Sequence, residues 1–474
     1  MEETLKTLLR NALQDGLKVV EEVLQESRER SSWWRIDKHK SYPLIQLHDN
    51  GFPSFYLSDY EKNDYGQILS KDSRGERIES WIRYHGYVTS SDELRKFYQI
   101  GEHAKGPTEA FNELWTKLFT YIHLSNFVDR YIHLNNEESN FCEDLFEEQF
   151  AKWIKSVTLS QLEIELHIPI LLLKFDFEEV KLNDHISVKK IDKQLQLSRH
   201  GKTSYIDSSK STVAAAATHS LVLKGCTIEN PDYKTRERTL NTVGSYSTIL
   251  KVTEDFFSSL RIKRGVVSGF CQIVAKAVSW EDRANGDLDH VNVVSVRKYP
   301  DYFDDYEWLA QPTTIEESEI KDILSFFEKI SSSKHNNINL ALSRLNTSYL
   351  RSREEDTILD ISIALESLLT HDSKSEITYR LASRIAALCS VKPFKDYSQF
   401  EVFSFCKSIY SFRSAIVHGD HKRVKKTQII KYQENREVST ITVAIELLRH
   451  VLEVLIENPK LNKPEELDKL KLNK

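Results

Sequence analysis

Apolar residues recur at helical spacing through much of the first 160 residues. The N-terminal leucines that share one face of a predicted amphipathic helix are Leu5, Leu8, Leu9, Leu13 and Leu17. An irregular, aromatic-rich stretch follows from about residue 33 to 65. Residues 109–157, which include "FNELWTKLFTYIHLSNFVDRYIHL", again show helical spacing. This part of the chain is therefore predicted to be largely helical.

From Leu166 the pattern changes to one that is typical of β-strands. The segment "LHIPILLLKFDFEEVKLNDHISVKKI" predicts two strands joined by a hairpin turn at Asn183 and Asp184. "THSLVLKG", "GVVSGFCQIVAKAVSW" and "HVNVVSVRKY" predict further strands, and "TLNTVGSYSTILKVTEDFFSSLRI" between them predicts a helix. Residues 1–311 are therefore expected to form a mixed α/β region, and a division into two subdomains near residue 160 is one option.

The pattern changes again at Pro312, which is followed by threonines and glutamates in an arrangement of the capping-box kind. Beyond it, the segments with helical apolar spacing are 356–369, 375–390, 398–418 and 439–457. The first and last of these are apolar around most of their circumference, which is typical of helices buried in a bundle or an oligomer interface. Residues 312–474 are therefore predicted to be an all-α bundle without strands, and the chain to be of the α+β class.

Composition limits the class of protein. Of the 474 residues, 40% are hydrophobic and 29% are charged, as in soluble globular proteins. No apolar run approaches the ~18 residues of a membrane helix, and the acidic N-terminus does not resemble a signal peptide. Five scattered cysteines without a C-x-x-C pair argue against a disulfide framework or a zinc site. We therefore expect a cytoplasmic protein with no cofactor. Because the net charge is −6, binding of nucleic acid would have to rest on local basic clusters.

The stretch "IYSFRSAIVHGDHKRVKK" holds the strongest candidate chemistry. Four residues separate Arg413 from His418, but with 25 arginines and 16 histidines chance supplies about one such pair. The context says more than the spacing. Gly419 predicts a helix end at His418, where the helix dipole favours a protonated imidazole. The basic residues that follow, and that are expected to contact RNA phosphates, are Lys422, Arg423, Lys425 and Lys426.

Helical geometry separates the two candidate catalytic residues. Five residues turn an α-helix by about 500°, which leaves Arg413 and His418 about 140° apart. A joint site needs an early helix end or a distortion before His418, or a two-fold interface to which each subunit contributes. The apolar neighbouring helices favour the interface, and so a homodimer. The alternative interpretation is structural: Arg413 pairs with Asp420 or Glu401, and His418 caps the helix.

Several segments in order resemble one known family. "ALESLL", "EITYRLASRIAAL", "IYSF" and "RSAIVHG" together resemble the Apea-like branch of the HEPN superfamily, over roughly residues 314–457. The resemblance implies a helical bundle that dimerises and a metal-independent endoribonuclease whose Arg-x4-His pair is Arg413 and His418. It also implies bacterial anti-phage defence by abortive infection, with residues 1–311 sensing a phage-derived protein or nucleic-acid trigger.

The chemistry implied by the resemblance suits these residue types. The 2′-hydroxyl of RNA, for example tRNA, attacks the adjacent phosphate and leaves a 2′,3′-cyclic phosphate and a 5′-hydroxyl end. Histidine moves protons near neutral pH, and a guanidinium stabilises the extra negative charge of the phosphorane. The main alternative is a non-catalytic HEPN module that binds RNA or a protein partner, for which the basic run matters but His418 does not.

Other residues are candidates for supporting the active site. Glu366 interrupts an apolar run and is expected to pair with Arg380 or Arg384, either beside the active site or as a pin for the bundle. Tyr379 lies next to Arg380 and shares its candidate supporting role. His421 is a candidate second proton carrier, although an exposed loop position is the simpler interpretation.

Two further groups are expected to be structural. His123 and His133, ten residues apart on a predicted helix, are interpreted as surface residues rather than metal ligands. "WWRIDKHK" (33–40) mixes aromatic and basic residues that could contact nucleic acid, but a tryptophan pair that packs between domains is the favoured interpretation.

Overall fold

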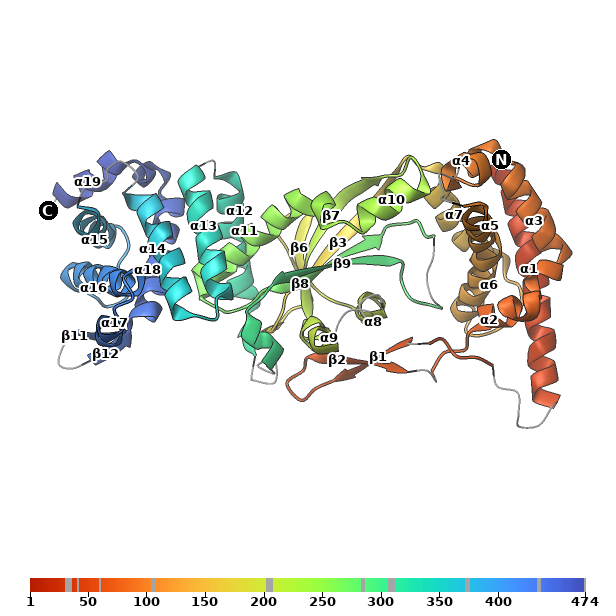
Figure 1. Ribbon diagram of the computed structural model, residues 1–474, viewed down its shortest axis with the longest axis horizontal. Helices are drawn as coiled ribbons and strands as arrows, with labels where there is room; N and C mark the ends of the chain where they lie inside the picture. The colour runs from red at the N-terminus through yellow and green to blue at the C-terminus, as the bar shows by residue number, and fades with distance from the viewer. Residues whose placement is uncertain are drawn as a thin grey trace. The chain divides into compact units, whose positions relative to one another are not determined.

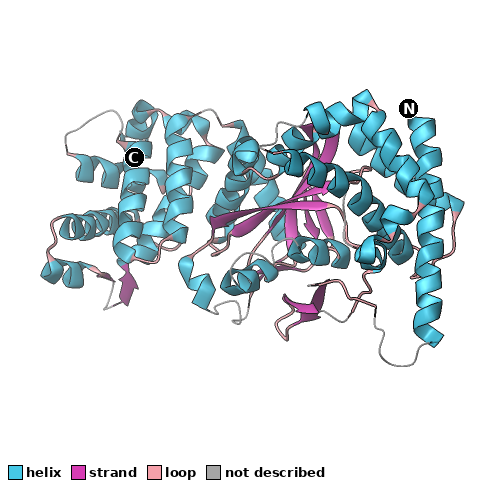
Figure 2. Ribbon diagram, turned by 45° about the vertical axis from the view of Figure 1, so that its right-hand side comes forward, coloured by secondary structure: helices cyan, strands magenta, loops and turns pink. Residues whose placement is uncertain are grey.

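A computed structural model gives the fold of most of the chain. The described residues are all except 30–35, 41, 59–60, 104–107, 202–207, 283–285, 306–311, 334, 371–375, 433–435 and 473–474. The fold is of the α+β class, as predicted from the sequence. An antiparallel sheet with helices precedes a C-terminal region that is mostly helical (Figure 2).

The chain folds into two compact units. Unit 1 comprises Met1–Pro169, Asn183–Ser245 and Gln272–Val296, and unit 2 comprises Ile170–Leu182, Tyr246–Cys271 and Arg297–Lys474. The chain therefore passes between the units several times. The sequence indicated a division at residue 311 and offered a further one near residue 160.

Unit 1 contains a helical layer built around its long N-terminal helix. Its helices (Figure 1) are α1 (Glu2–Glu29), α2 (Tyr65–Ser70), α3 (Glu79–Ser90), α4 (Asp92–Tyr98), α5 (Glu109–Lys117), α6 (His123–Leu134), α7 (Glu143–Thr158), α8 (Lys193–Gly201), α9 (Ser208–Ala215) and α10 (Tyr233–Leu240). The predicted leucine face of α1 is largely buried, and it packs with residues of α3 and α6 in one hydrophobic core. Gly16 allows the close approach, because a Cβ there would lie 2.8 Å from Val128 of α6. The indole Nε1 of Trp81 donates to the carbonyl of Ala12 at 2.9 Å.

The strands of unit 1 form an antiparallel sheet and a separate hairpin. The hairpin is β1 (Tyr42–Leu47) with β2 (Pro53–Ser58), and the sheet strands are β3 (Gln161–Pro169), β6 (Ile186–Lys190), β7 (His219–Glu229), β8 (Phe270–Ala277) and β9 (Val291–Lys298). Within unit 1 the strand order is β6-β7-β3-β8-β9. The expectation of an irregular stretch from 33 to 65 was wrong where the hairpin forms. The predicted turn is confirmed, since Asn183 Oδ1 accepts hydrogen bonds from the amides of His185 and Ile186 at 2.9 Å each.

Unit 2 is mainly a helical bundle. Its helices are α11 (Ser247–Arg264), α12 (Glu317–Ser332), α13 (Asn336–Leu350), α14 (Glu354–Leu369), α15 (Ile377–Leu388), α16 (Gln399–Val417), α17 (His421–Thr427), α18 (Thr440–Glu457) and α19 (Pro464–Leu472). Its strands are β4 (Leu173–Phe175), β5 (Glu179–Lys181), β10 (Thr313–Ile315), β11 (Ile429–Tyr432) and β12 (Arg436–Ser439). The four predicted helical segments are confirmed as α14, α15, α16 and α18.

The prediction that strands disappear after residue 312 was wrong. β10 pairs in parallel with β4, and β11 and β12 form a short antiparallel hairpin between α17 and α18. The predicted helix start is confirmed, but the capping residue is Glu316, which exchanges hydrogen bonds with Glu319 at the start of α12. Threonines 313 and 314 instead lie in β10.

The core of the bundle is built on α14 and α18, the two helices that were predicted to be apolar around most of their circumference. α14 and α18 bury most of their apolar side chains in one continuous cluster with residues of α13, α15 and α16. Figure 1 labels these helices in the C-terminal part of the ribbon. None of the helices in the described part of the chain combines the length and apolar character that crossing a bilayer would require. The five cysteines are all free.

Candidate active site

The candidate site is built on the end of α16. Gly419 adopts a left-handed conformation with φ of +64°. Its amide donates to the carbonyl of Ile416 at 3.1 Å, and the amide of Asp420 donates to the carbonyl of Ala415 at 2.9 Å. These two bonds are the Schellman arrangement that ends a helix and satisfies its last carbonyls. The helix stop predicted at Gly419 is therefore confirmed.

α16 remains helical up to this stop. It runs without interruption to Val417, and the amide of His418 still donates to the carbonyl of Ser414 at 3.1 Å. An early helix end before His418 is therefore not found. Arg413, which is half-buried, and His418, which is exposed, stay on different faces about 140° apart.

Arg413 has no recorded partner among the described residues. Its Nε is enclosed by protein atoms and makes no hydrogen bond there. The structural alternative required Asp420 or Glu401 as its partner, but Asp420 Oδ1 accepts from the amide of Arg423 at 3.0 Å. Glu401 accepts from the amide of Ser398 at 2.8 Å, and neither carboxylate forms a recorded ion pair with Arg413. A half-buried guanidinium with unused donors is suited to bind an anion that approaches from solvent.

A buried tyrosine, Tyr410, lies one turn before Arg413 and pairs with a partly buried glutamate. Tyr410 donates from its hydroxyl to Glu366 Oε1 of α14 at 2.9 Å. Burial and then the negative charge of Glu366 raise the pKa of Tyr410, and the positive charge of Arg413 opposes the shift. Glu366 therefore anchors α16 on the side that carries Arg413.

The predicted pairing of Glu366 with Arg384 is not found, and the recorded partner of Glu366 is Tyr410. Arg384 is fully buried, but it faces α19: its Nη2 lies 2.7 Å and its Nε 3.1 Å from the carboxylate of Asp468. The hydrogen bond from Arg384 holds the pKa of Asp468 well below its usual range, against partial burial that raises it. Arg384 is therefore a structural pin between α15 and the C-terminal helix.

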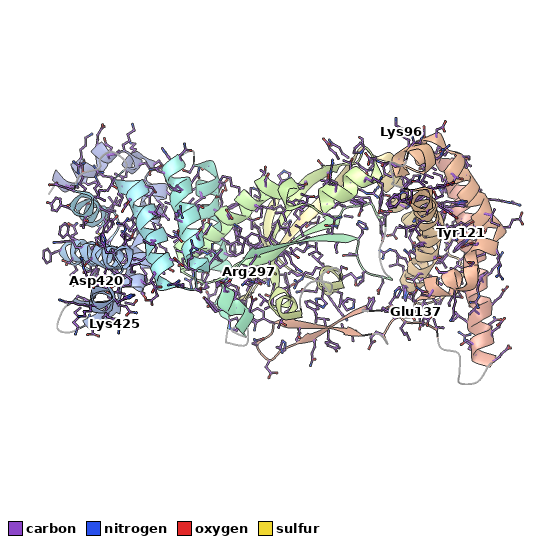
Figure 3. The ribbon with its side chains drawn as sticks, viewed as in Figure 1. Lys96, Tyr121, Glu137, Arg297, Asp420 and Lys425 are labelled. Atoms are coloured by element: carbon purple, nitrogen blue, oxygen red, sulfur yellow. The ribbon has the colours of Figure 1, made fainter. Side chains whose placement is uncertain are left out.

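The predicted basic run forms a short helix. Asp420 caps the start of α17, and the exposed side chains on this helix are those of His421, Lys422, Arg423, Lys425 and Lys426. Figure 3 labels Asp420 and Lys425 near this helix, next to the end of α16. The guanidinium Nη2 of Arg423 donates to the hydroxyl of Ser411 on α16 at 3.0 Å.

The lysines of α17 project from one side of the helix. Lys422, Lys425 and Lys426 have i, i+3 and i+4 spacing, and none of them forms a recorded ion pair with a described residue. This is a concentrated positive surface on a chain whose net charge is −6. It begins at Lys422, four residues after the C-cap residue His418.

The remaining candidate, Tyr379, is not brought to Arg413. Its side chain is 62% exposed, and its ring meets that of Phe403 edge-on with centroids 5.8 Å apart. Phe400, one turn earlier on α16, is 78% exposed. Tyr379 and these two phenylalanines therefore form an aromatic patch on α15 and α16, and no contact records a role for Tyr379 in supporting the active site.

Comparison with known proteins adds no identification. No family model matches the chain, and neither a curated protein nor a solved structure shows a significant match to it. The function must therefore be argued from the chemistry of the site.

The interpretation of His123 and His133 as surface residues was wrong. Both are buried in α6, and the ring of His123 lies 5.3 Å from that of Trp153. His133 instead joins a polar cluster with Asp129 and with His39, which belongs to the "WWRIDKHK" stretch. The tryptophan pair of that stretch lies outside the described residues.

The cluster of His39, Asp129 and His133 was missed by sequence reasoning. The sequence did contain one indication of this cluster. Asp129 and His133 are four residues apart on a predicted helix, and this spacing places two potential metal ligands on one face. Nothing in the sequence indicates that His39, 90 residues before Asp129, would meet them.

Proposed function

We propose that the protein is a metal-independent endoribonuclease of the HEPN type that uses Arg413 and His418. The observation that carries the proposal is the state of the two side chains. Within the described part of the chain Arg413 is half-buried and has no hydrogen-bond acceptor, and the lysines of α17 form no ion pair. His418 is exposed at the end of α16, just before α17. An anionic polymer could reach all of these groups from solvent.

The residues fit RNA cleavage by transesterification. The 2′-oxygen forms a bond to phosphorus as the bond from phosphorus to the 5′-oxygen breaks. One imidazole accepts the proton of the 2′-hydroxyl, and a protonated imidazole supplies a proton to the departing 5′-oxygen. The guanidinium of Arg413 stabilises the additional negative charge on the phosphorane, and the lysines of α17 hold neighbouring phosphates.

The reaction is proposed to occur in a homodimer. Because α16 is regular up to its end, one copy directs Arg413 and His418 to different faces, whereas a two-fold axis can bring residues of both copies to one groove. Phe400 lies 18 residues before His418, which is five complete turns, so both project from the same face of α16. The exposed ring of Phe400 supports a protein interface along the face that carries His418.

We further propose a role in anti-phage defence by abortive infection, with the N-terminal part of the chain sensing a phage-derived protein or nucleic acid. This part of the proposal rests on the sequence resemblance alone. Cleavage of tRNA or other cellular RNA would then stop growth of the infected cell.

The test compares RNA cleavage by matched histidine variants. Purified wild-type protein, His418→Ala, Arg413→Ala and His335→Ala are incubated with tRNA and total RNA in EDTA. His335 is an exposed histidine of the same unit at the start of α13, so its variant controls for loss of a surface imidazole. We expect the wild type and His335→Ala to leave 5′-hydroxyl ends that polynucleotide kinase labels directly, and the other two variants to leave none.

Overexpression in cells tests the same assignment if the purified protein shows no cleavage. The wild type should arrest growth and His418→Ala should not. Equal cleavage by the wild type and His418→Ala, or equal growth arrest by both, would contradict the catalytic assignment.

A non-catalytic RNA-binding module is the second candidate, and the exposed lysines of α17 favour it. Filter binding to single-stranded RNA separates the two functions together with the cleavage assay. If His418→Ala binds RNA as tightly as the wild type and neither protein cleaves RNA or arrests growth, the binding module is the better description.

A further inference from the structure

A second polar cluster is enclosed in unit 1, and the ribonuclease proposal does not use it. Asp129 and His133 lie one turn apart on the same face of α6. His39 approaches them from the segment between α1 and β1. Its Nε2 lies 2.9 Å from Asp129 Oδ2, and His133 Nε2 lies 3.5 Å from Asp129 Oδ1. One ligand-type atom from each of the three residues lies within 4.8 Å of the others.

Backbone hydrogen bonds fix the position of His39. Its amide donates to the carbonyl of Lys62 at 2.9 Å, and the amide of Asp64 donates to the carbonyl of Asp37 at 2.8 Å. The next amide, that of Tyr65, donates to Asp129 Oδ1 at 2.9 Å. The two short segments around His39 and Asp64 are thus held together against the carboxylate of α6.

Each histidine has a carboxylate on its outer side. His39 Nδ1 lies 3.7 Å from Asp64 Oδ2, and His133 Nδ1 lies 3.7 Å from Glu137 Oε1. The side chain of His133 is 0% exposed, and its Nδ1 makes no hydrogen bond to any residue that the structure describes. Both imidazoles therefore direct Nε2 towards Asp129 and Nδ1 towards an outer carboxylate. Metal-binding histidines in proteins are oriented by outer carboxylates in this way.

The cluster carries an excess of negative charge. Asp64, Asp129, Glu137 and Asp287 lie around the two histidines, and the amine of Lys62 lies 3.5 Å from Glu137 and 3.4 Å from Asp287. The formal charge of these five side chains is −3 when both imidazoles are neutral. Because Asp129 is buried and the others are at most 40% exposed, this charge is only partly screened by water. Figure 3 labels Glu137 at the end of α6, where this group lies.

We propose that His39, Asp129 and His133 bind a divalent cation of the zinc class. Two imidazole nitrogens and one carboxylate oxygen are a donor set that zinc uses in proteins. Ligand atoms of a tetrahedral zinc site with bonds of about 2.0–2.1 Å are roughly 3.3 Å apart. Each histidine Nε2 lies near that distance from one oxygen of Asp129, His39 at 2.9 Å from Oδ2 and His133 at 3.5 Å from Oδ1, and a single set of one atom from each residue lies within 4.8 Å, so binding would draw the three side chains slightly together. The cation offsets two of the three excess negative charges.

The carbonyl of Asn63 completes the arrangement. It lies 2.9 Å from His133 Nε2, so the metal-free histidine can donate its Nε2 proton to that oxygen. When Nε2 binds the cation, the ring carries its proton on Nδ1, which lies 3.7 Å from Glu137 Oε1, and the Asn63 oxygen is free to become the fourth ligand. No proton leaves the imidazole in this change of tautomer. The bound cation would join the segment around His39 and Asn63 to α6, and this inference does not depend on the ribonuclease proposal.

The test measures metal uptake by the full-length chain. Protein stripped with a chelator and dialysed is titrated with Co²⁺, whose visible absorption reports a tetrahedral site, and the bound Co²⁺ is then displaced with Zn²⁺. We expect about one equivalent of Co²⁺ per chain and loss of the absorption in Asp129→Asn and His133→Gln. His123→Gln is the matched control, because His123 is a buried histidine of the same helix outside the cluster.

A thermal-shift measurement gives a second readout. Free Zn²⁺ at a hundred times its dissociation constant should shift the ratio of folded to unfolded protein about 100-fold, and so raise the Tm of the wild type and of His123→Gln only. If Asp129→Asn or His133→Gln does not fold, His39→Gln replaces it in both measurements, because His39 lies on the more exposed side of the cluster. Absence of Co²⁺ uptake by the wild type, or equal uptake by His39→Gln and His123→Gln, would overturn the proposal.

Discussion

Acidification should destabilise the bundle through His450. This residue of α18 is 7% exposed, its ring lies 5.3 Å from that of Phe394, and its Nε2 has no hydrogen-bond partner among the described residues. Burial lowers the pKa of His450 to about 4; the negative charge of Glu453 opposes this shift, and the positive charge of Lys392 adds to it. The folded protein therefore keeps His450 neutral at a pH where the unfolded chain protonates it.

The sign and size of the effect follow from these two pKa values. Above about pH 6.5 the imidazole is neutral in both states and contributes no pH dependence. Between about pH 6.5 and pH 4 only the unfolded chain binds the proton, so the free energy of unfolding falls by roughly 1.4 kcal/mol per pH unit. The loss from pH 7.5 to 4.5 is about 2.5 kcal/mol, and it levels off below pH 4.

Urea unfolding of the wild type and His450→Gln measures this contribution. Far-UV circular dichroism is the appropriate probe, because it follows the helices of the bundle directly, whereas all seven tryptophans precede residue 312. Other groups also titrate, so the decisive quantity is the difference between the two proteins at each pH. We expect that difference to change by about 2.5 kcal/mol in favour of the variant on going from pH 7.5 to 4.5. Parallel pH profiles for the two proteins would refute the reasoning.

Three further perturbations test the candidate site. Gly419→Ala should lower the free energy of unfolding by about 1 kcal/mol through backbone strain alone, since φ is +64° and a Cβ would meet no atom within 4 Å; thermal unfolding measures the loss. Tyr410→Phe removes the donor to a partly buried Glu366 and should cost about 1–3 kcal/mol in urea unfolding, with a much smaller loss if Glu366→Gln is already present. Replacing the three lysines of α17 by alanine should reduce the slope of log affinity for single-stranded RNA against log salt by about 2, and an unchanged slope would exclude their contact with phosphates.

The bundle could be predicted because its signals are local. Apolar spacing located α14, α15, α16 and α18, and Gly419 located the end of α16. The hairpin of β11 and β12 was missed because each strand has only four residues, too few for an alternating pattern to be recognised.

The partners of polar residues could not be predicted in the same way. The positions of Arg380 and Arg384 along the chain made them the predicted partners of Glu366, but the observed partner is Tyr410 on α16. Arg384 turns towards α19, an element beyond the last predicted helix. Which buried groups meet is decided by how helices pack, and several arrangements of one bundle are compatible with the same periodicity.

The same limit explains the contrast between the two candidate sites. Arg413 and His418 lie five residues apart, so the sequence could locate both and even state the angle between them. His39 and Asp129 are far apart in the chain, and only backbone pairing of residues 37–39 with 62–64 brings them together. Sequence reasoning is therefore strongest for sites carried by one helix and weakest for sites closed by irregular segments.

The regularity of α16 links catalysis to dimerisation. A distorted helix end would have let one copy combine Arg413 and His418, and the hydrogen bond from the amide of His418 to the carbonyl of Ser414 removes that option. If the pair is catalytic, each copy must then meet groups of a second copy, and the rate of cleavage per chain must fall as the dimer is diluted below its dissociation constant. Phe400 is remote from Arg413 but shares the face of His418, so a substitution there can test dimerisation without removing either candidate catalytic side chain. A charged residue at position 400 should weaken the dimer and reduce the rate of cleavage in proportion.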